Sequence, residues 1–119
     1  MAESAQKDSI IVKTHDLLKE MIGVVKRFPR DQKFLLGDRL QTTVTDVLEL
    51  LIEAYYLPGA QKRHKLERVN MQLEKLRHYL RLSYELGFYN SIRLGQLQER
   101  VQEIGRMNGG WLKSLGAAG

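Results

Sequence analysis

The chain has 119 residues, a net charge of +5 and a pI near 9.6, with 43% apolar and 28% charged residues. These values are typical of one globular domain, large enough to bury a core without stabilising disulfides or metal ions. The absence of cysteine excludes disulfides, thiolate metal sites and cysteine nucleophiles, and it agrees with a reducing cytoplasm. No stretch approaches the ~20 uninterrupted apolar residues of a membrane helix, and the N-terminus lacks a secretory-signal pattern. We therefore expect a cytoplasmic protein without a membrane partner.

Apolar residues that recur at alternating spacings of three and four predict four helices. Residues 1–8 are small and polar, and we expect them to form a disordered tail before a single domain over 9–116. The predicted helices span about 9–27, 32–57, 60–86 and 91–115. Because the three connections are short, consecutive helices should be antiparallel neighbours. The predicted fold class is therefore all-α, an antiparallel up-down-up-down four-helix bundle.

Single residues mark the predicted helix ends and seams. Pro29 should end the first helix, and Asp31 could cap the second by accepting backbone N–H bonds. Asn90 or Ser91 could cap the fourth, whose apolar seam contains one polar residue, Asn108. The first helix is predicted to bury a seam of Ile11, Thr14, Leu18, Met21, Val25 and Phe28.

Positive charge is concentrated in two segments. Residues 26–39 carry five basic and two acidic residues and residues 61–81 carry seven and two, whereas residues 40–60 carry three acids and no base. Such segregation favours a polyanion partner, and a solvated helix face is the alternative. In such a bundle, one end should carry Lys26, Arg27, Arg30, Lys33, Arg77, Arg81 and Arg93. The other end should carry Lys62, Arg63, Lys65, Arg106 and Lys113.

Large apolar residues outside the seams exceed what a small bundle needs to bury. An exposed surface of this kind is typical of an oligomer interface. The surplus residues are Tyr55, Tyr56, Tyr79, Leu82, Leu86, Phe88 and Tyr89, and the first five are predicted to form the interface. The alternative is that helix irregularity turns these residues towards the core.

The sequence contains no pattern that indicates catalysis. A di-iron bundle needs Glu-x-x-His pairs, and none of His15, His64 and His78 has an acidic residue three positions earlier. Glu74 and His78 are four apart, a spacing more typical of a surface hydrogen bond. No nucleophile elbow, phosphate loop or sequence-reading nucleic-acid motif is present. We predict no enzyme activity, no metal and no cofactor, with a metalloenzyme bundle as the least favoured class.

Four segments together resemble a known family. They are FPRDQKFLLGDRL (28–40), LELLIEAYY (48–56), LEKLRHYLRLSYELGF (73–88) and EIGRMNGGWLKSL (103–115). These segments are similar to four-helix proteins related to Avd, the accessory variability determinant of diversity-generating retroelements. Wider relatives are encoded in intervening sequences of bacterial large-subunit ribosomal RNA genes. The resemblance covers roughly residues 10–115.

The resemblance implies a homopentameric, ring-shaped, basic accessory protein that binds structured RNA and a reverse transcriptase and has no active site. The resemblance and the positive charge at the ends of the bundle together predict the nucleic-acid or partner contacts. These are Arg27, Arg30, Lys33, Arg39, Arg77, Arg81 and Arg106. Capping and ion pairing are alternative roles for Arg30 and Arg39, and a subunit contact is the alternative for Arg106. The alternative function is a homo-oligomeric scaffold with no nucleic-acid partner.

Overall fold

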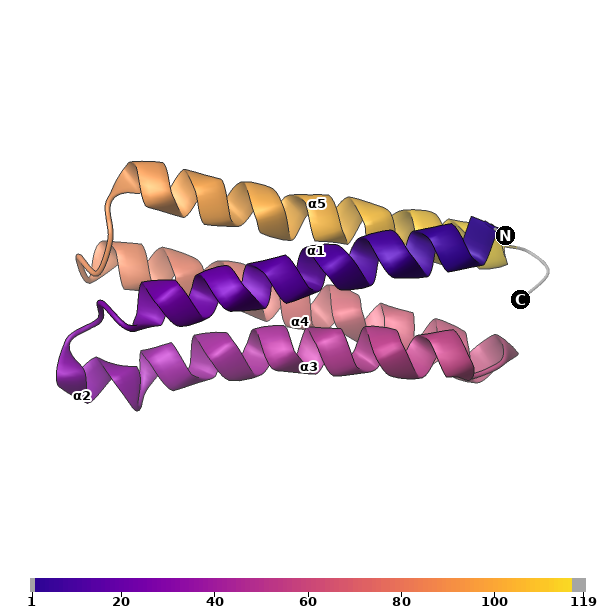
Figure 1. The fold of residues 1–119 in the computed structure, drawn as a ribbon, viewed down its shortest axis with the longest axis horizontal. Coiled ribbons are helices and arrows are strands. Elements are labelled where there is room, and N and C mark those ends of the chain that lie inside the picture. The colour runs from indigo at the N-terminus through magenta and orange to yellow at the C-terminus, as the bar shows by residue number, and fades with distance from the viewer. Residues whose placement is uncertain (1, 117–119) are drawn as a thin grey trace.

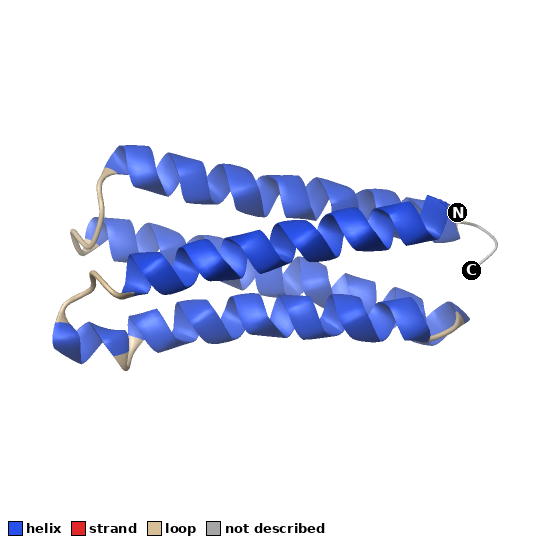
Figure 2. Cartoon of the chain, viewed as in Figure 1, coloured by secondary structure: helices blue, strands red, loops and turns tan. Residues whose placement is uncertain are grey.

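Each long helix buries an apolar stripe, and the four stripes meet along one core (Figure 1). A computed structural model describes residues 2–116, with the side chains of residues 9–116. Its helices are α1 (Ala2–Val25), α2 (Arg30–Lys33), α3 (Leu36–Tyr56), α4 (Gly59–Glu85) and α5 (Ser91–Leu115). The described part of the chain contains no strand (Figure 2). The predicted all-α up-down-up-down bundle is confirmed.

The long helices form a closed square in cross-section. α3 packs against α1 and α4, and α5 packs against the same two helices. The bundle measures 47 × 24 × 19 Å along its principal axes. The end of α1, the short α2, the start of α3, the end of α4 and the start of α5 lie together at one end (Figure 1). This shared end holds most of the residues discussed below.

The buried stripes follow the predicted spacing in α3, α4 and α5, but the first stripe is wider than predicted. Four predicted seam residues, Thr14, Met21, Val25 and Phe28, are buried. Ile10, Leu17 and Val24, each one position before a predicted seam residue, are also buried, and the predicted Ile11 and Leu18 are half-buried. Because α1 contacts both α3 and α5, its apolar stripe is wider than one heptad seam.

The connection between α1 and α3 differs from the prediction. The second long helix begins at Leu36 rather than residue 32, because the one-turn α2 precedes it. Asp31 lies in the first turn of α2 and makes no cap, since Pro29 occupies the cap position without a side-chain hydrogen bond. α3 approaches α1 closely at Gly37, where a Cβ atom would lie 2.6 Å from Val25 Cγ1. The glycine therefore allows the start of α3 to pack closely against the end of α1.

The remaining boundaries follow local chemistry. α1 begins at Ala2, so residues 2–8 are helical where the sequence predicted a disordered tail, and Met1 lies outside the described residues. Ala, Glu, Gln and Lys are good helix formers, which extends the first helix. Asn90 caps α5 as predicted, because its Oδ1 accepts a hydrogen bond from the Arg93 backbone N–H at 2.8 Å.

Candidate nucleic-acid interface

An aromatic cluster holds together the end of the bundle where basic residues gather. The Phe28 ring, in the turn after α1, lies 4.9 Å from Phe88 and 6.3 Å from Tyr89, measured between centroids. The Tyr89 hydroxyl donates a hydrogen bond to the Leu80 carbonyl oxygen of α4. Phe88 and Tyr89 are therefore half-buried, and they do not belong to an exposed aromatic surface.

The cluster also changes the chemistry of Tyr89. Burial of the hydroxyl raises the pKa of Tyr89 to about 12, and a hydrogen bond with Ser83 partly offsets this increase. The phenol stays protonated at neutral pH and can keep donating to Leu80. The connection between α4 and α5 is thus tied to both α1 and α4.

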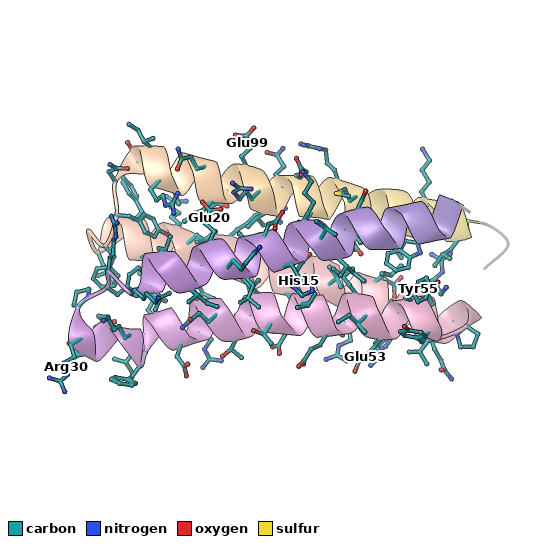
Figure 3. All side chains as sticks on the ribbon, viewed as in Figure 1. His15, Glu20, Arg30, Glu53, Tyr55 and Glu99 are labelled. Carbon is teal, nitrogen blue, oxygen red and sulfur yellow. The ribbon has the colours of Figure 1, made fainter. Side chains whose placement is uncertain are left out.

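Five predicted contact residues lie at this end, which we call the basic end: Arg27, Arg30, Lys33, Arg39 and Arg81. α1 ends just before Arg27, α2 carries Arg30 and Lys33, and α3 carries Arg39 in its first turn. Figure 3 shows Arg30 at the extreme end, pointing away from the bundle.

Most cations of the basic end have no acidic partner. Among the described residues, Arg27, Arg30, Lys33 and Arg39 form no ion pair, although Asp31 and Asp38 are nearby in sequence. Arg81 pairs with Glu85 at 3.3 Å, and both side chains are largely exposed. Ion pairing within the chain, the alternative role of Arg30 and Arg39, is therefore not observed in the described part of the protein.

The cations at the opposite end are more often engaged. Arg63 donates to the Gly116 carbonyl oxygen at 2.9 Å, and Lys65 pairs with Glu53 at 3.2 Å. Lys62 is only 9% exposed. The basic end therefore has more positive charge available to a partner than the opposite end.

Arg77 and Arg106 lie together instead of at opposite ends. Both line a hollow of about 360 Å³ between α4 and α5, with Gly105 beside them. A Cβ atom at position 105 would lie 3.2 Å from Arg77 Nη2, so the glycine makes room for this guanidinium. Arg77 also pairs with Glu74 at 3.1 Å. The predicted placement was wrong because both residues lie several turns in from their helix ends, and antiparallel packing aligns them.

The predicted interface residues fall into two groups. Tyr79, Leu82 and Leu86 line a hollow of about 610 Å³ beside the basic end, together with Arg39. Tyr55 and Tyr56 lie at the opposite end of the bundle, near the end of α3, with their rings in edge contact at 5.0 Å (Figure 3 labels Tyr55).

The two most exposed apolar residues of the 610 Å³ hollow were not predicted from the sequence. Phe34 is 77% exposed and Leu35 is 64% exposed, and both line it. They occupy the break between α2 and α3, which the heptad pattern did not reveal. Three consecutive apolar residues, Phe34-Leu35-Leu36, were the available signal, because one helical stripe cannot bury all three.

The described residues contain no group of three His, Asp or Glu side chains that could hold a metal ion. Glu74 Oε1 lies 3.6 Å from His78 Nε2 on the surface of α4, which is beyond hydrogen-bond distance. None of the described helices has the length and apolar character needed to cross a membrane.

Comparison with known proteins identifies the family. The sequence model of the bAvd-like family matches residues 9–115. The chain belongs to this family. The earlier resemblance to Avd-related four-helix proteins is confirmed, and the match spans all four long helices of this bAvd-like chain.

A solved structure supports the fold of the bAvd-like chain. It is a crystal structure of a protein with unknown function from the S23 ribosomal protein family of Bacteroides thetaiotaomicron. The TM-score is 0.83 at 14% sequence identity, and the match covers 91% of this chain and 98% of the other. At this identity the likeness concerns the fold alone. No curated protein matches the sequence.

Proposed function

We propose that this chain is a non-enzymatic accessory protein that binds structured RNA through its basic end. The observation that carries the proposal is the set of cations there without an acidic partner among the described residues: Arg27, Arg30, Lys33 and Arg39. Unpaired cations can neutralise phosphates and release their counterions, which makes binding strongly salt-dependent. Membership of the bAvd-like family supports an accessory role.

The protein partner in this proposal is a reverse transcriptase, as in diversity-generating retroelements. The support is the family relationship to Avd-type proteins. The expected genomic arrangement is a reverse-transcriptase gene beside this gene, with paired template and variable repeats. Co-purification of that enzyme with the protein is the direct test, and a complex that survives nuclease treatment would separate protein contact from shared RNA.

RNA binding is tested by measuring affinity for a structured RNA across salt concentrations. The double variant Arg30→Gln/Arg39→Gln should weaken binding and reduce the slope of log K against log salt by about two. The matched control is Arg68→Gln/Lys75→Gln, which removes the same charge from exposed positions in the middle of α4. Equal losses in both variants, or affinity no better than for an unrelated acidic polymer, would contradict the proposal.

We also propose that copies of the chain assemble into a ring, with a pentamer favoured. The support is the exposed apolar surface of the 610 Å³ hollow, where Leu82 is 43% and Leu86 is 54% exposed. Light scattering should give about 69 kDa for five copies of 13.8 kDa. Leu82→Glu should dissociate the ring, whereas Met71→Glu, at an exposed α4 position outside the hollow, should not. A 13.8 kDa particle for the unmodified protein would contradict assembly.

The second candidate function is a scaffold that binds proteins without RNA. The observation that favours it is the same exposed apolar surface, because contiguous patches of this kind mark protein-interaction sites. In that case the Leu82→Glu variant would lose its protein partner, while Arg30→Gln, at an exposed position that does not line the hollow, would keep it. The paired result separates the two functions.

A further inference from the structure

A separate hollow of about 590 Å³ opens at the basic end, between the last turns of α1 and the start of α5. We call it the α1–α5 hollow. The lining residues used below are Gly23, Arg27, Phe88, Asn90, Arg93 and Gln96. Its lining contains no acidic side chain. The volume lies within the range typical of small-ligand sites.

The lining combines three kinds of chemistry. Arg27 is an exposed cation with no ion pair among the described residues. Phe88 is a half-buried ring. Its contact with Phe28, at 4.9 Å between ring centroids, holds it in place. Asn90 and Gln96 add amide groups that can donate and accept hydrogen bonds.

Contacts within the protein also fix the side chains of Arg93 and Gln96. Arg93 Nη1 lies 2.9 Å from Glu20 Oε2 and donates to Gln96 Oε1 at 3.1 Å. Figure 3 shows Glu20 between α1 and α5, on the side where this pair forms. Because Glu20 engages Arg93, Arg27 is the cation of the hollow that is free to meet an anion.

We propose that the α1–α5 hollow binds one unstacked nucleotide of single-stranded RNA, with its base against Phe88 and its phosphate at Arg27. Proteins recognise splayed RNA bases by stacking them on aromatic rings and by hydrogen bonding their edges, which matches this lining. The neighbouring Arg30 continues the positive surface for adjacent phosphates. The inference rests on the proposed RNA-binding function and assigns it a base-binding pocket.

Gly23 makes the pocket testable without removing any charge. A Cβ atom at position 23 would meet no other atom within 4 Å, so a larger side chain would fit beside the hollow without a clash. Gly95 is also an exposed glycine inside a long helix with open space at its Cβ position, but it does not line the hollow. Gly23→Leu and Gly95→Leu are therefore a matched pair, and both should keep or raise stability because glycine is a poor helix former.

The experiment uses a short single-stranded RNA that carries 2-aminopurine at its centre, whose fluorescence falls when the base stacks on an aromatic ring. The unmodified protein and Gly95→Leu should bind and quench the fluorescence. Gly23→Leu should bind about tenfold more weakly with an unchanged salt slope, since stacking of one base contributes roughly this much. An abasic nucleotide at the centre should weaken binding to the unmodified protein by a similar factor.

A second variant guards against an indirect effect. Phe88→Leu keeps apolar volume against Phe28 but removes the flat ring, so it should abolish the quenching. Thermal unfolding of all three variants checks that each is folded.

Distinct results overturn the inference and the proposed function. If Gly23→Leu and Gly95→Leu bind equally, and the abasic RNA binds like the intact RNA, the pocket is wrong while RNA binding stands. If the unmodified protein binds neither the short RNA nor a structured one, both proposals fail. If AMP binds as tightly as the short RNA, the ligand is a free nucleotide and the RNA assignment is overturned.

Discussion

The Nδ2 atom of Asn108 lies 2.8 Å from the carbonyl oxygen of Leu66, so a polar side chain joins α5 to α4 within an apolar core. The same amino group donates to Asn70 Oδ1 at 2.9 Å. Asn108 is fully buried. A buried amide that must meet particular partners disfavours shifted alignments of two helices, and we infer that Asn108 sets the register of α5 against α4.

Removing this amide should destabilise the bundle. We expect Asn108→Ala to lower the free energy of unfolding by about 2 kcal/mol, through lost hydrogen bonds and a cavity. Asn108→Asp should cost more at neutral pH, because a buried carboxylate cannot donate to the Leu66 carbonyl. Urea unfolding measures both values. Asn70→Ala is the control, since it leaves the Leu66 bond intact, and an equal cost for Asn70→Ala would contradict the assigned role.

A side chain at position 37 should disturb the contact between α1 and α3. The Cβ atom of Gly37→Ala would lie 2.6 Å from Val25 Cγ1, so we expect a loss of about 1–3 kcal/mol. A Cβ atom at position 23 would meet no other atom within 4 Å, so Gly23→Ala should instead be neutral or stabilise the fold by up to about 1 kcal/mol. Chemical denaturation compares the two. Val25→Ala should reduce the cost of Gly37→Ala when the two changes are combined, and strict additivity would argue against the clash.

The stability that Tyr89 contributes should depend on pH. Its pKa of about 12 in the folded protein exceeds the value near 10 expected when unfolded. The contribution should therefore be complete below pH about 10 and be lost as the pH rises to about 12. Tyr89→Phe should cost about 1 kcal/mol at neutral pH and show less of this alkaline loss.

Urea unfolding from neutral to alkaline pH, with absorbance of the tyrosinate as a second measurement, checks the role of Tyr89. Tyr56→Phe is the control, because the Tyr56 side chain is 75% exposed and its hydroxyl makes little contribution to packing. A constant difference between the unmodified protein and Tyr89→Phe across the alkaline range would refute the prediction.

Glu20 should stabilise the contact between α1 and α5. Its side chain is 15% exposed and engages both Arg93 and Arg100 of α5. We expect Glu20→Gln to lower the free energy of unfolding by about 1–2 kcal/mol, and less at high salt. Glu103→Gln breaks the more exposed pair with Lys13 and should cost less than about 0.5 kcal/mol. Denaturant unfolding at low and high salt measures both losses of unfolding free energy. A larger loss for Glu103→Gln than for Glu20→Gln would contradict the prediction.

The helices were predictable because their signals are local. Spacings of three and four located α3, α4 and α5 to within a residue or two, except where α2 precedes α3. Asn90 was recognisable as a cap from its type and position. The break at Phe34 and Leu35 escaped the pattern, because the spacing from Leu36 onward is the same whether the helix begins at 32 or at 36.

The candidate site was less predictable, because its geometry depends on contacts between distant segments. The sequence placed Arg77 and Arg106 at opposite ends, and the alignment of α4 with α5 brings them to one hollow. It treated Phe88 and Tyr89 as possible surface residues, and contact with Phe28 turns them inward.

The sequence by itself determined that this chain forms an antiparallel bundle of four long helices with positive charge concentrated in two segments. Apolar periodicity, turn residues and charge are properties of neighbouring residues, so they can be read along the chain. Only the tertiary structure decided which cations lack an acidic partner and where the hollows open. These features depend on how each helix is rotated and shifted against its neighbours, and close contacts such as Gly37 with Val25 and Asn108 with Leu66 set that arrangement.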